Sequence, residues 1–126
     1  MVEDNIKSTG KNKMIESYNF GQTVINGKKY SSDLIIFKDY IYDSWWRKEG
    51  HNLCIDDIKE IINKKPDILV VGTGCFGLMK VPKELIEHIK SSGIKQVIVK
   101  KTGDACNEYN KLYKKENIVA ALHLTC

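Results

Sequence analysis

The sequence predicts a three-layer α/β fold with a mixed central sheet, and two features of the 126-residue chain predict it. The second half alternates helix-period segments with short apolar runs at 68–71, 96–99 and 118–124, as in parallel strands joined by crossover helices. The first half carries short β-branched and aromatic runs divided by turn residues, which is typical of antiparallel strands. We therefore expect three parallel C-terminal strands and an N-terminal antiparallel β addition that extends the sheet or folds over one edge.

The N-terminal part begins with polar residues that show no periodicity. We interpret residues 1–13 as a flexible leader and 14–126 as a single domain. Strands are expected over 15–20, 22–25, 28–30, 34–37 and 40–42. The second and third of these are joined by Asn26-Gly27, which suits a type I′ turn because both central residues need positive φ.

Three helices are expected in the C-terminal half. The first carries isoleucines on one face and two acids at its start: Ile55, Ile58, Ile61 and Ile62, with Asp56 and Asp57. Pro82 is expected as the first residue of the second helix, and Gly93 marks its end. Thr102 is expected to cap the third helix.

Charge and composition exclude several classes of function. The net charge is +4, and lysines alternate with acids in the helices, as on a solvated surface and not on a nucleic-acid stripe. The aromatic residues do not interleave with basic ones in the sequence as stacking platforms require. No apolar run could span a bilayer, and the N-terminus lacks the apolar segment of a secretory signal. We expect a cytoplasmic protein with no nucleic-acid partner and no membrane insertion.

The cysteine pattern favours reduced thiols and no metal. None of the four forms a C-x-x-C pair: Cys54, Cys75, Cys106 and Cys126. Two H-x-x-C pairs, His51–Cys54 and His123–Cys126, offer zinc-type ligands. They lie far apart in the sequence and neither resembles a zinc knuckle, so no metal site is expected.

A glycine motif follows the first apolar run of the second half. Gly72-Thr73-Gly74-Cys75-Phe76-Gly77 matches G-x-G-x-x-G. However, four residues separate the motif from Pro82, where the next helix is expected to begin, whereas in a dinucleotide site the helix begins within the motif. The next strand ends in two lysines and offers no carboxylate for a ribose, so no dinucleotide or other cofactor is expected. Two interpretations stay open: a tight turn that needs positive φ, and a loop whose exposed N–H groups hold a small anion.

Cys75 lies within this motif and invites comparison with a nucleophile elbow. Thr73 and Gly77 are small, as the positions flanking an elbow must be, and a base would have to come from one of the three histidines: His51, His88 or His123. An elbow leads directly into a helix, however, and this segment does not. We interpret Cys75 as a packing residue and assign no catalytic residue.

Trp45-Trp46-Arg47 is the most unusual patch of the sequence. Adjacent tryptophans on a strand point to opposite sides, so one belongs at a surface, cleft or interface. Arg47 is the only arginine in the chain. Its fork could clamp a phosphate or carboxylate ligand, or it could anchor the loop by pairing with an acid.

These residues together form one candidate site. We expect them to line a shallow, positively biased recess at the carboxyl edge of the parallel strands, where α/β proteins bind ligands. The candidate residues are Trp46, Arg47, His51, Gly72, Thr73, Gly74, Cys75, Gly77 and Lys80.

Several segments in a fixed order resemble a known family. They are Tyr18-Asn19-Phe20-Gly21, Trp46-Arg47-Lys48-Glu49-Gly50-His51, Pro66 to Gly74, Leu78-Met79-Lys80-Val81-Pro82, Glu108-Tyr109-Asn110 and Leu122-His123-Leu124-Thr125-Cys126. Over about residues 14–126 the chain resembles the adipogenesis-associated Mth domain family, which includes a mitochondrial assembly factor for respiratory complex I. The resemblance implies a mixed central sheet with helices. It brings no established activity, and the complex I role belongs to a mitochondrial branch.

The function expected from the sequence is a non-enzymatic protein-binding or assembly module. Such a module would act through a protein partner or through self-association. The alternative is a small-molecule or anion binder, or an enzyme, that uses the cleft near the Gly72–Gly77 loop.

Overall fold

The computed structural model describes residues 13–126, so residues 1–12 of the expected leader lie outside the described part. Lys13 belongs to the packed domain, since it is buried and its Nζ donates a hydrogen bond to the Lys38 carbonyl.

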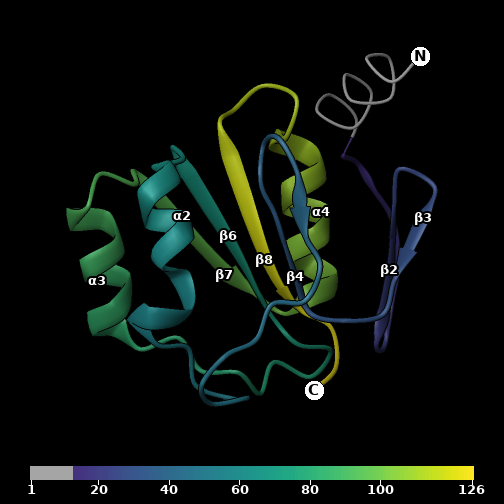
Figure 1. Ribbon diagram of the computed structural model, residues 1–126, viewed down its shortest axis with the longest axis horizontal. Coiled ribbons are helices and arrows are strands. Elements are labelled where there is room, and N and C mark those ends of the chain that lie inside the picture. The colour runs from purple at the N-terminus through teal and green to yellow at the C-terminus, as the bar shows by residue number, and fades with distance from the viewer. Residues whose placement is uncertain (1–12) are drawn as a thin grey trace.

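Figure 1 shows a central sheet between two covering layers, and the helices and strands have these bounds. They are β1 (Ile15–Asn19), β2 (Gln22–Ile25), β3 (Lys28–Tyr30), β4 (Leu34–Ile36), β5 (Ile41–Tyr42), η1 (Ile55–Ile58), α2 (Lys59–Lys64), β6 (Ile68–Thr73), α3 (Lys83–Ser91), β7 (Gln96–Lys100), α4 (Thr102–Leu112) and β8 (Ile118–His123).

The central sheet is mixed, as the sequence predicts. Its five strands run in the order β5-β4-β8-β6-β7. β6 pairs in parallel with both β7 and β8, whereas β4 is antiparallel to β8 and to β5. All residues of β6 and β8 are buried because helices or strands cover both faces, which explains why these strands read as continuous apolar runs.

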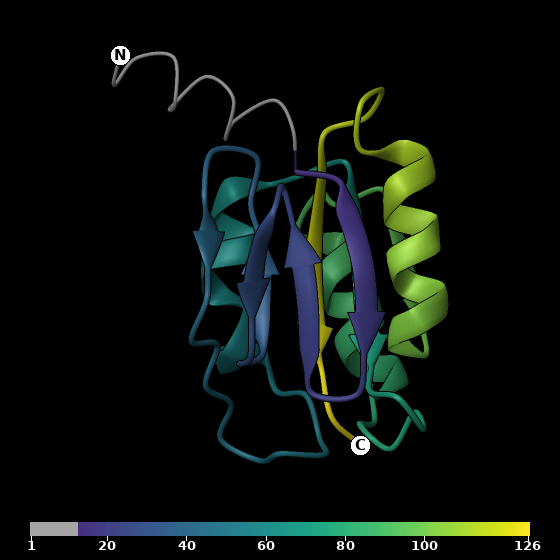
Figure 2. The same cartoon turned by 90° about the vertical axis from the view of Figure 1, so that its right-hand side faces the viewer.

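The N-terminal β addition divides into two parts. β4 and β5 extend the central sheet, while β1, β2 and β3 form a separate antiparallel sheet. Figure 2 shows this second sheet beside α4, both on the same face of the central sheet. Isoleucines of β1 and β2 and the inner side of α4 share one core, which includes Ile15, Ile25, Ala105 and Tyr109. The opposite face is covered by η1, α2 and α3, with Trp45 and Leu53 in that core.

Local details confirm some expectations and correct others. Asn26 and Gly27 have φ values of 51° and 79°, so the expected turn with two positive φ angles is confirmed. The first expected helix is interrupted, since a 3-10 turn at Ile55–Ile58 precedes α2. α3 begins at Lys83, one residue later than expected, and Pro82 is its N-cap. Within residues 13–126 we find no helix with the length and apolar character needed to cross a bilayer.

Candidate functional site

The Gly72–Gly77 loop lies at the carboxyl edge of the parallel strands, but the N–H groups of Gly74, Cys75 and Gly77 are already bonded within the chain. The N–H groups of Cys75 and Leu78 donate to the carbonyls of Thr125 and Cys126, at 2.6 and 3.0 Å. Those of Gly77 and Met79 donate to carbonyls of the loop and of β6, at 3.2 and 3.1 Å. The C-terminal segment thus occupies the position that a bound anion would need, and the expected N–H cradle is not formed.

Two glycines of the motif are required because other parts of the chain approach them closely. A Cβ at Gly72 would lie 2.8 Å from Thr102 Oγ1 and 3.0 Å from Leu122, so glycine lets α4 pack against β6. Gly74 has a φ of +108°, and a Cβ there would collide with the backbone of Cys126 and lie 2.9 Å from the His123 ring. The tight-turn interpretation of the motif therefore agrees with the structure.

Thr102 joins three segments at this point. Its hydroxyl accepts a hydrogen bond from the Gly74 N–H at 2.8 Å and donates one to the His123 carbonyl at 2.6 Å. The expectation that Thr102 caps α4 is wrong, since Lys101 is the N-cap and Thr102 is the first helical residue. Because a hydroxyl can donate and accept at once, the buried Thr102 side chain holds the ends of β6 and β8 against α4.

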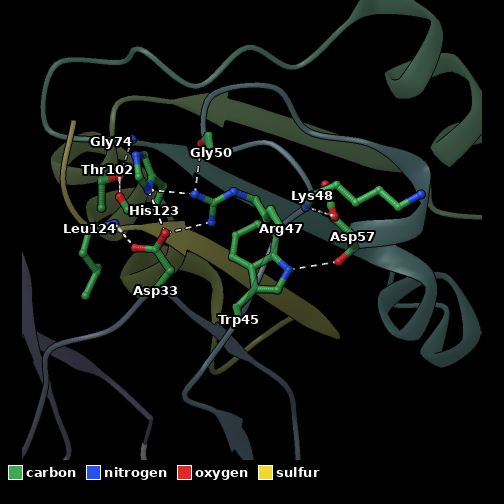
Figure 3. A network of polar contacts seen from close by, with 10 residues as sticks. All are labelled: Asp33, Trp45, Arg47, Lys48, Gly50, Asp57, Gly74, Thr102, His123 and Leu124. Atoms are coloured by element: carbon green, nitrogen blue, oxygen red, sulfur yellow. Dashed lines mark hydrogen bonds and ion pairs between the residues drawn. The ribbon is translucent and has the colours of Figure 1, made fainter.

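A buried ionic cluster lies beside this junction. Figure 3 shows Arg47 and His123 converging on Asp33, a residue that precedes β4. Arg47 Nη1 lies 2.8 Å from Asp33 Oδ2, and Arg47 Nη2 donates to the Gly50 carbonyl at 3.0 Å. Asp33 Oδ1 accepts a hydrogen bond from the Leu124 N–H at 2.7 Å. The guanidinium also stacks on the buried ring of Trp45, with Cζ 4.8 Å from the ring centroid. The cluster ties the 43–50 loop to β4 and β8.

Asp33 and His123 share a short contact, with His123 Nδ1 2.8 Å from Asp33 Oδ2. Burial by itself raises the pKa of Asp33, but hydrogen bonds from His123, the Leu124 N–H and Arg47 outweigh it and hold this pKa below its usual range. The His123 Nε2 atom is buried and has no partner within the described residues. It cannot reach a substrate in this structure, so the Asp33–His123 pair resembles a catalytic pair in its contacts but not in its access to solvent.

The expected recess requires a correction. Arg47 does lie near Gly74, because the His123 ring contacts both residues: Arg47 Nη2 is 3.1 Å from His123 Nδ1. However, the guanidinium is buried against Asp33, with 5% of its side chain exposed. It cannot act as a free anion clamp. Of the two roles that the sequence left open for Arg47, the structure shows the loop anchor paired with an acid.

The remaining candidate residues are distributed around this cluster. His51 is exposed, and its ring packs edge-on against His123 with a centroid separation of 5.8 Å. Lys80 is exposed, but its backbone pairs with the segment from His51 to Leu53. Thr73 is buried at the end of β6, and its hydroxyl donates to the Lys100 carbonyl. Cys75 is half-buried next to Tyr18, whose pKa is raised by burial and by this thiol.

The two tryptophans have opposite environments, as expected for one buried and one surface residue. Trp45 is 5% exposed and its Nε1 donates to the Asp57 carbonyl, whereas Trp46 is 75% exposed. The three apolar side chains Phe20, Phe76 and Leu78 are also exposed, at 54%, 62% and 51%. Sequence reasoning missed Phe20 and Phe76. The available signal was an aromatic residue next to a turn glycine in each case.

Fold and site together define a small α/β domain of a class that recurs among solved structures. One is a conserved hypothetical protein from Pyrococcus horikoshii OT3, with 28% identity, a TM-score of 0.74, and coverage of 89% of this chain and 98% of that one. The protein MT938 is 21% identical with a TM-score of 0.73, covering 90% and 98%. A Mth938-like domain from Bordetella pertussis is 19% identical with a TM-score of 0.63, covering 92% and 87%.

The chain belongs to the family described as "Protein of unknown function (DUF498/DUF598)", whose model matches residues 15–123. This finding and the Mth938-like neighbours confirm the resemblance noted in the sequence.

Proposed function

We propose that this domain is a non-enzymatic protein-binding module. Its partner would dock on the aromatic loop surface, which we define as Phe20, Phe76 and Leu78. The observation that carries the proposal is that two phenylalanines from distant segments contact each other on the solvent-exposed surface. Their ring centroids lie 6.1 Å apart although each side chain is more than half exposed. Large aromatic side chains that contact each other in solvent are typical of binding hot spots.

The backbone beneath this surface is held in place before any partner arrives. The Gly21 N–H donates to the Leu124 carbonyl at 2.8 Å, which fixes the β1–β2 turn to the C-terminal segment. The same segment receives the hydrogen bonds from Cys75 and Leu78 described above. A surface whose backbone is already ordered loses less entropy on binding, which favours affinity.

The chemistry of the surface indicates what kind of partner would fit. Lys101 lies against Gly77, and Lys80 is exposed at the far end of the loop. The apolar centre therefore has a basic rim, and a complementary partner would offer an apolar pocket with acidic residues around it. Trp46, on the loop anchored by Arg47, is a further exposed aromatic at this end of the molecule.

The alternative of an anion site or an active site in the Gly72–Gly77 loop has less support, since the loop's N–H groups are used internally. We assign the module to the cytoplasm, where its four thiols would stay reduced.

Photo-cross-linking in cells tests the proposal. A photo-reactive phenylalanine analogue at position 76 should give one discrete cross-linked protein. The same analogue at Val99 should not, although Val99 is also an exposed apolar residue, at 36%. Phe20→Ser should remove the species seen from position 76. A cross-linked species of two copies would identify the partner as the chain itself. The same pattern from both positions, or no effect of Phe20→Ser, would contradict the proposal.

A further inference from the structure

A second candidate site lies at the opposite edge of the sheet, where the parallel strands begin. A groove of about 620 Å³ opens there between the C-terminal end of α4, the turn that follows it and the loop after β4. This edge is at the top of Figure 1, opposite the end marked C. Grooves of this volume commonly hold small molecules. A smaller cavity of about 170 Å³ adjoins it and shares Phe37, Lys38 and Asn117 with it.

The groove concentrates positive charge that the rest of the described chain does not neutralise. The two cavities together are lined by five lysines and two carboxylates, a net charge of +3: Lys13, Lys38, Lys64, Lys114 and Lys115, with Asp39 and Glu116. Every lysine ion pair within residues 13–126 is elsewhere, at Lys48, Lys59, Lys95 and Lys111. The C-terminal ends of α2 and α4 offset about half a charge each, so an excess of roughly two positive charges remains.

Lys13 is the most informative of these residues. It is only 3% exposed, yet no carboxylate of residues 13–126 lies within ion-pair distance, and its Nζ has a carbonyl partner at 2.7 Å. Burial lowers the pKa of this ammonium, and the charge of Asp39 opposes that effect only in part. A largely buried ammonium that forms no ion pair among residues 13–126 is costly, and an anion in the groove would relieve this cost.

Aromatic rings stand beside the lysines. Tyr113 stacks on Tyr109 with ring centroids 5.5 Å apart, and Phe37 stacks on Tyr40 at 4.8 Å. Lys114 Nζ lies 5.9 Å from the centroid of the Tyr113 ring. Flat apolar surfaces next to ammonium groups suit a ligand that has an anionic end and a planar organic part. In the sequence Phe37 precedes Lys38 and Tyr113 precedes Lys114 and Lys115, but these two short segments lie far apart and come together only in the fold.

We propose that this groove binds a small phosphorylated organic molecule, with its phosphates on Lys38, Lys114 and Lys115 and its planar part against Tyr113. A small molecule fits better than a nucleic-acid strand because the excess charge is confined to one groove. On α3 and α4, by contrast, lysines are balanced by acids. The proposal is independent of the aromatic loop surface at the other edge.

Calorimetric titration at low salt tests it with pyrophosphate, ADP and adenosine as probes. Pyrophosphate and ADP should bind one molecule per chain, whereas adenosine should not. Lys114→Glu/Lys115→Glu should weaken ADP binding by about tenfold or more. The matched control is Lys83→Glu/Lys90→Glu, which makes the same change of charge at two exposed α3 lysines and should leave binding unchanged. Tyr113→Leu should weaken ADP but not pyrophosphate.

Three outcomes would overturn the proposal. The first is no saturable binding of either pyrophosphate or ADP at millimolar concentration. The second is an equal loss in the two lysine double variants, which would show attraction by net charge alone. The third is tighter binding of a single-stranded RNA oligomer than of ADP, which would make the groove part of a nucleic-acid surface.

Discussion

Charged side chains have opposite environments at the two ends of the parallel strands, which we call the carboxyl edge and the amino edge of the sheet. At the carboxyl edge the ionic groups are buried and bonded to one another: Asp33, Arg47 and His123 share short contacts, and the glycine loop uses its N–H groups internally. At the amino edge, five lysines surround a groove without an ion pair among residues 13–126. Charges that are bonded internally hold a fold together, while charges that are left unneutralised are available to a ligand. At the edge where α/β proteins usually bind ligands, the ionic groups of this domain serve to hold the fold together.

Substitutions of one cation at each edge give the largest contrast. Arg47→Ala should lower the free energy of unfolding by about 3–5 kcal/mol, because it removes the cation from the half-buried Asp33 carboxylate and the donor from the Gly50 carbonyl. Lys115→Ala, at the amino edge, should change it by less than about 0.5 kcal/mol. Urea unfolding followed by circular dichroism measures both. Arg47→Lys should restore only part of the loss, since an ammonium cannot reproduce the fork. Similar values for the two alanine variants would remove the distinction between the edges.

Alanine substitutions at two glycines with nearly the same φ distinguish the cost of backbone strain from the cost of a steric clash. Gly74 and Gly93 have φ values of 108° and 112°, but only at Gly74 would an added Cβ meet other atoms within 4 Å. Gly93→Ala should cost about 1–2 kcal/mol from strain alone, while Gly74→Ala should cost about 3 kcal/mol or more. Thermal unfolding of the two variants measures the difference. Equal melting temperatures would mean that the C-terminal segment moves aside easily and that the carboxyl edge is less rigid than its contacts indicate.

The smallest expected effect concerns acid stability. The folded-state pKa of Asp33 is lowered, so its contribution to stability is present above its unfolded value of about 3.9 and is lost as the pH falls through the folded value. Asp33→Asn should therefore flatten the loss of stability below about pH 4. Asp43→Asn removes the same charge from an exposed loop and serves as the control. The measurement is the urea midpoint of each variant from pH 2 to 6. If the midpoint falls with decreasing pH in the same way in both variants, the role of Asp33 is contradicted.

The sequence predicted those parts of the molecule that depend on local pattern. The β6 and β8 strands and the Asn26-Gly27 turn follow from residue order alone, because periodicity and backbone preference act over a few residues. The candidate site combined residues that do lie near one another, including Arg47, His51 and Gly74. Its predicted chemistry failed because Arg47 pairs with Asp33, which lies 14 positions away, and no local pattern indicates which acid a buried arginine will meet. The lysine groove was missed for the same reason.

The position of β8 has a consequence for how the chain is made. Among the strands of residues 13–126 this one comes last along the chain, yet it lies between β4 and β6 in the middle of the sheet. During synthesis the ribosome releases β4 and β6 long before their shared neighbour, so each presents an apolar strand with an open edge while the chain grows. Cooperative folding must wait until residues 118–123 leave the exit tunnel. Pairing of β8 with β4 and β6 is therefore the step that closes both open strand edges and completes the sheet.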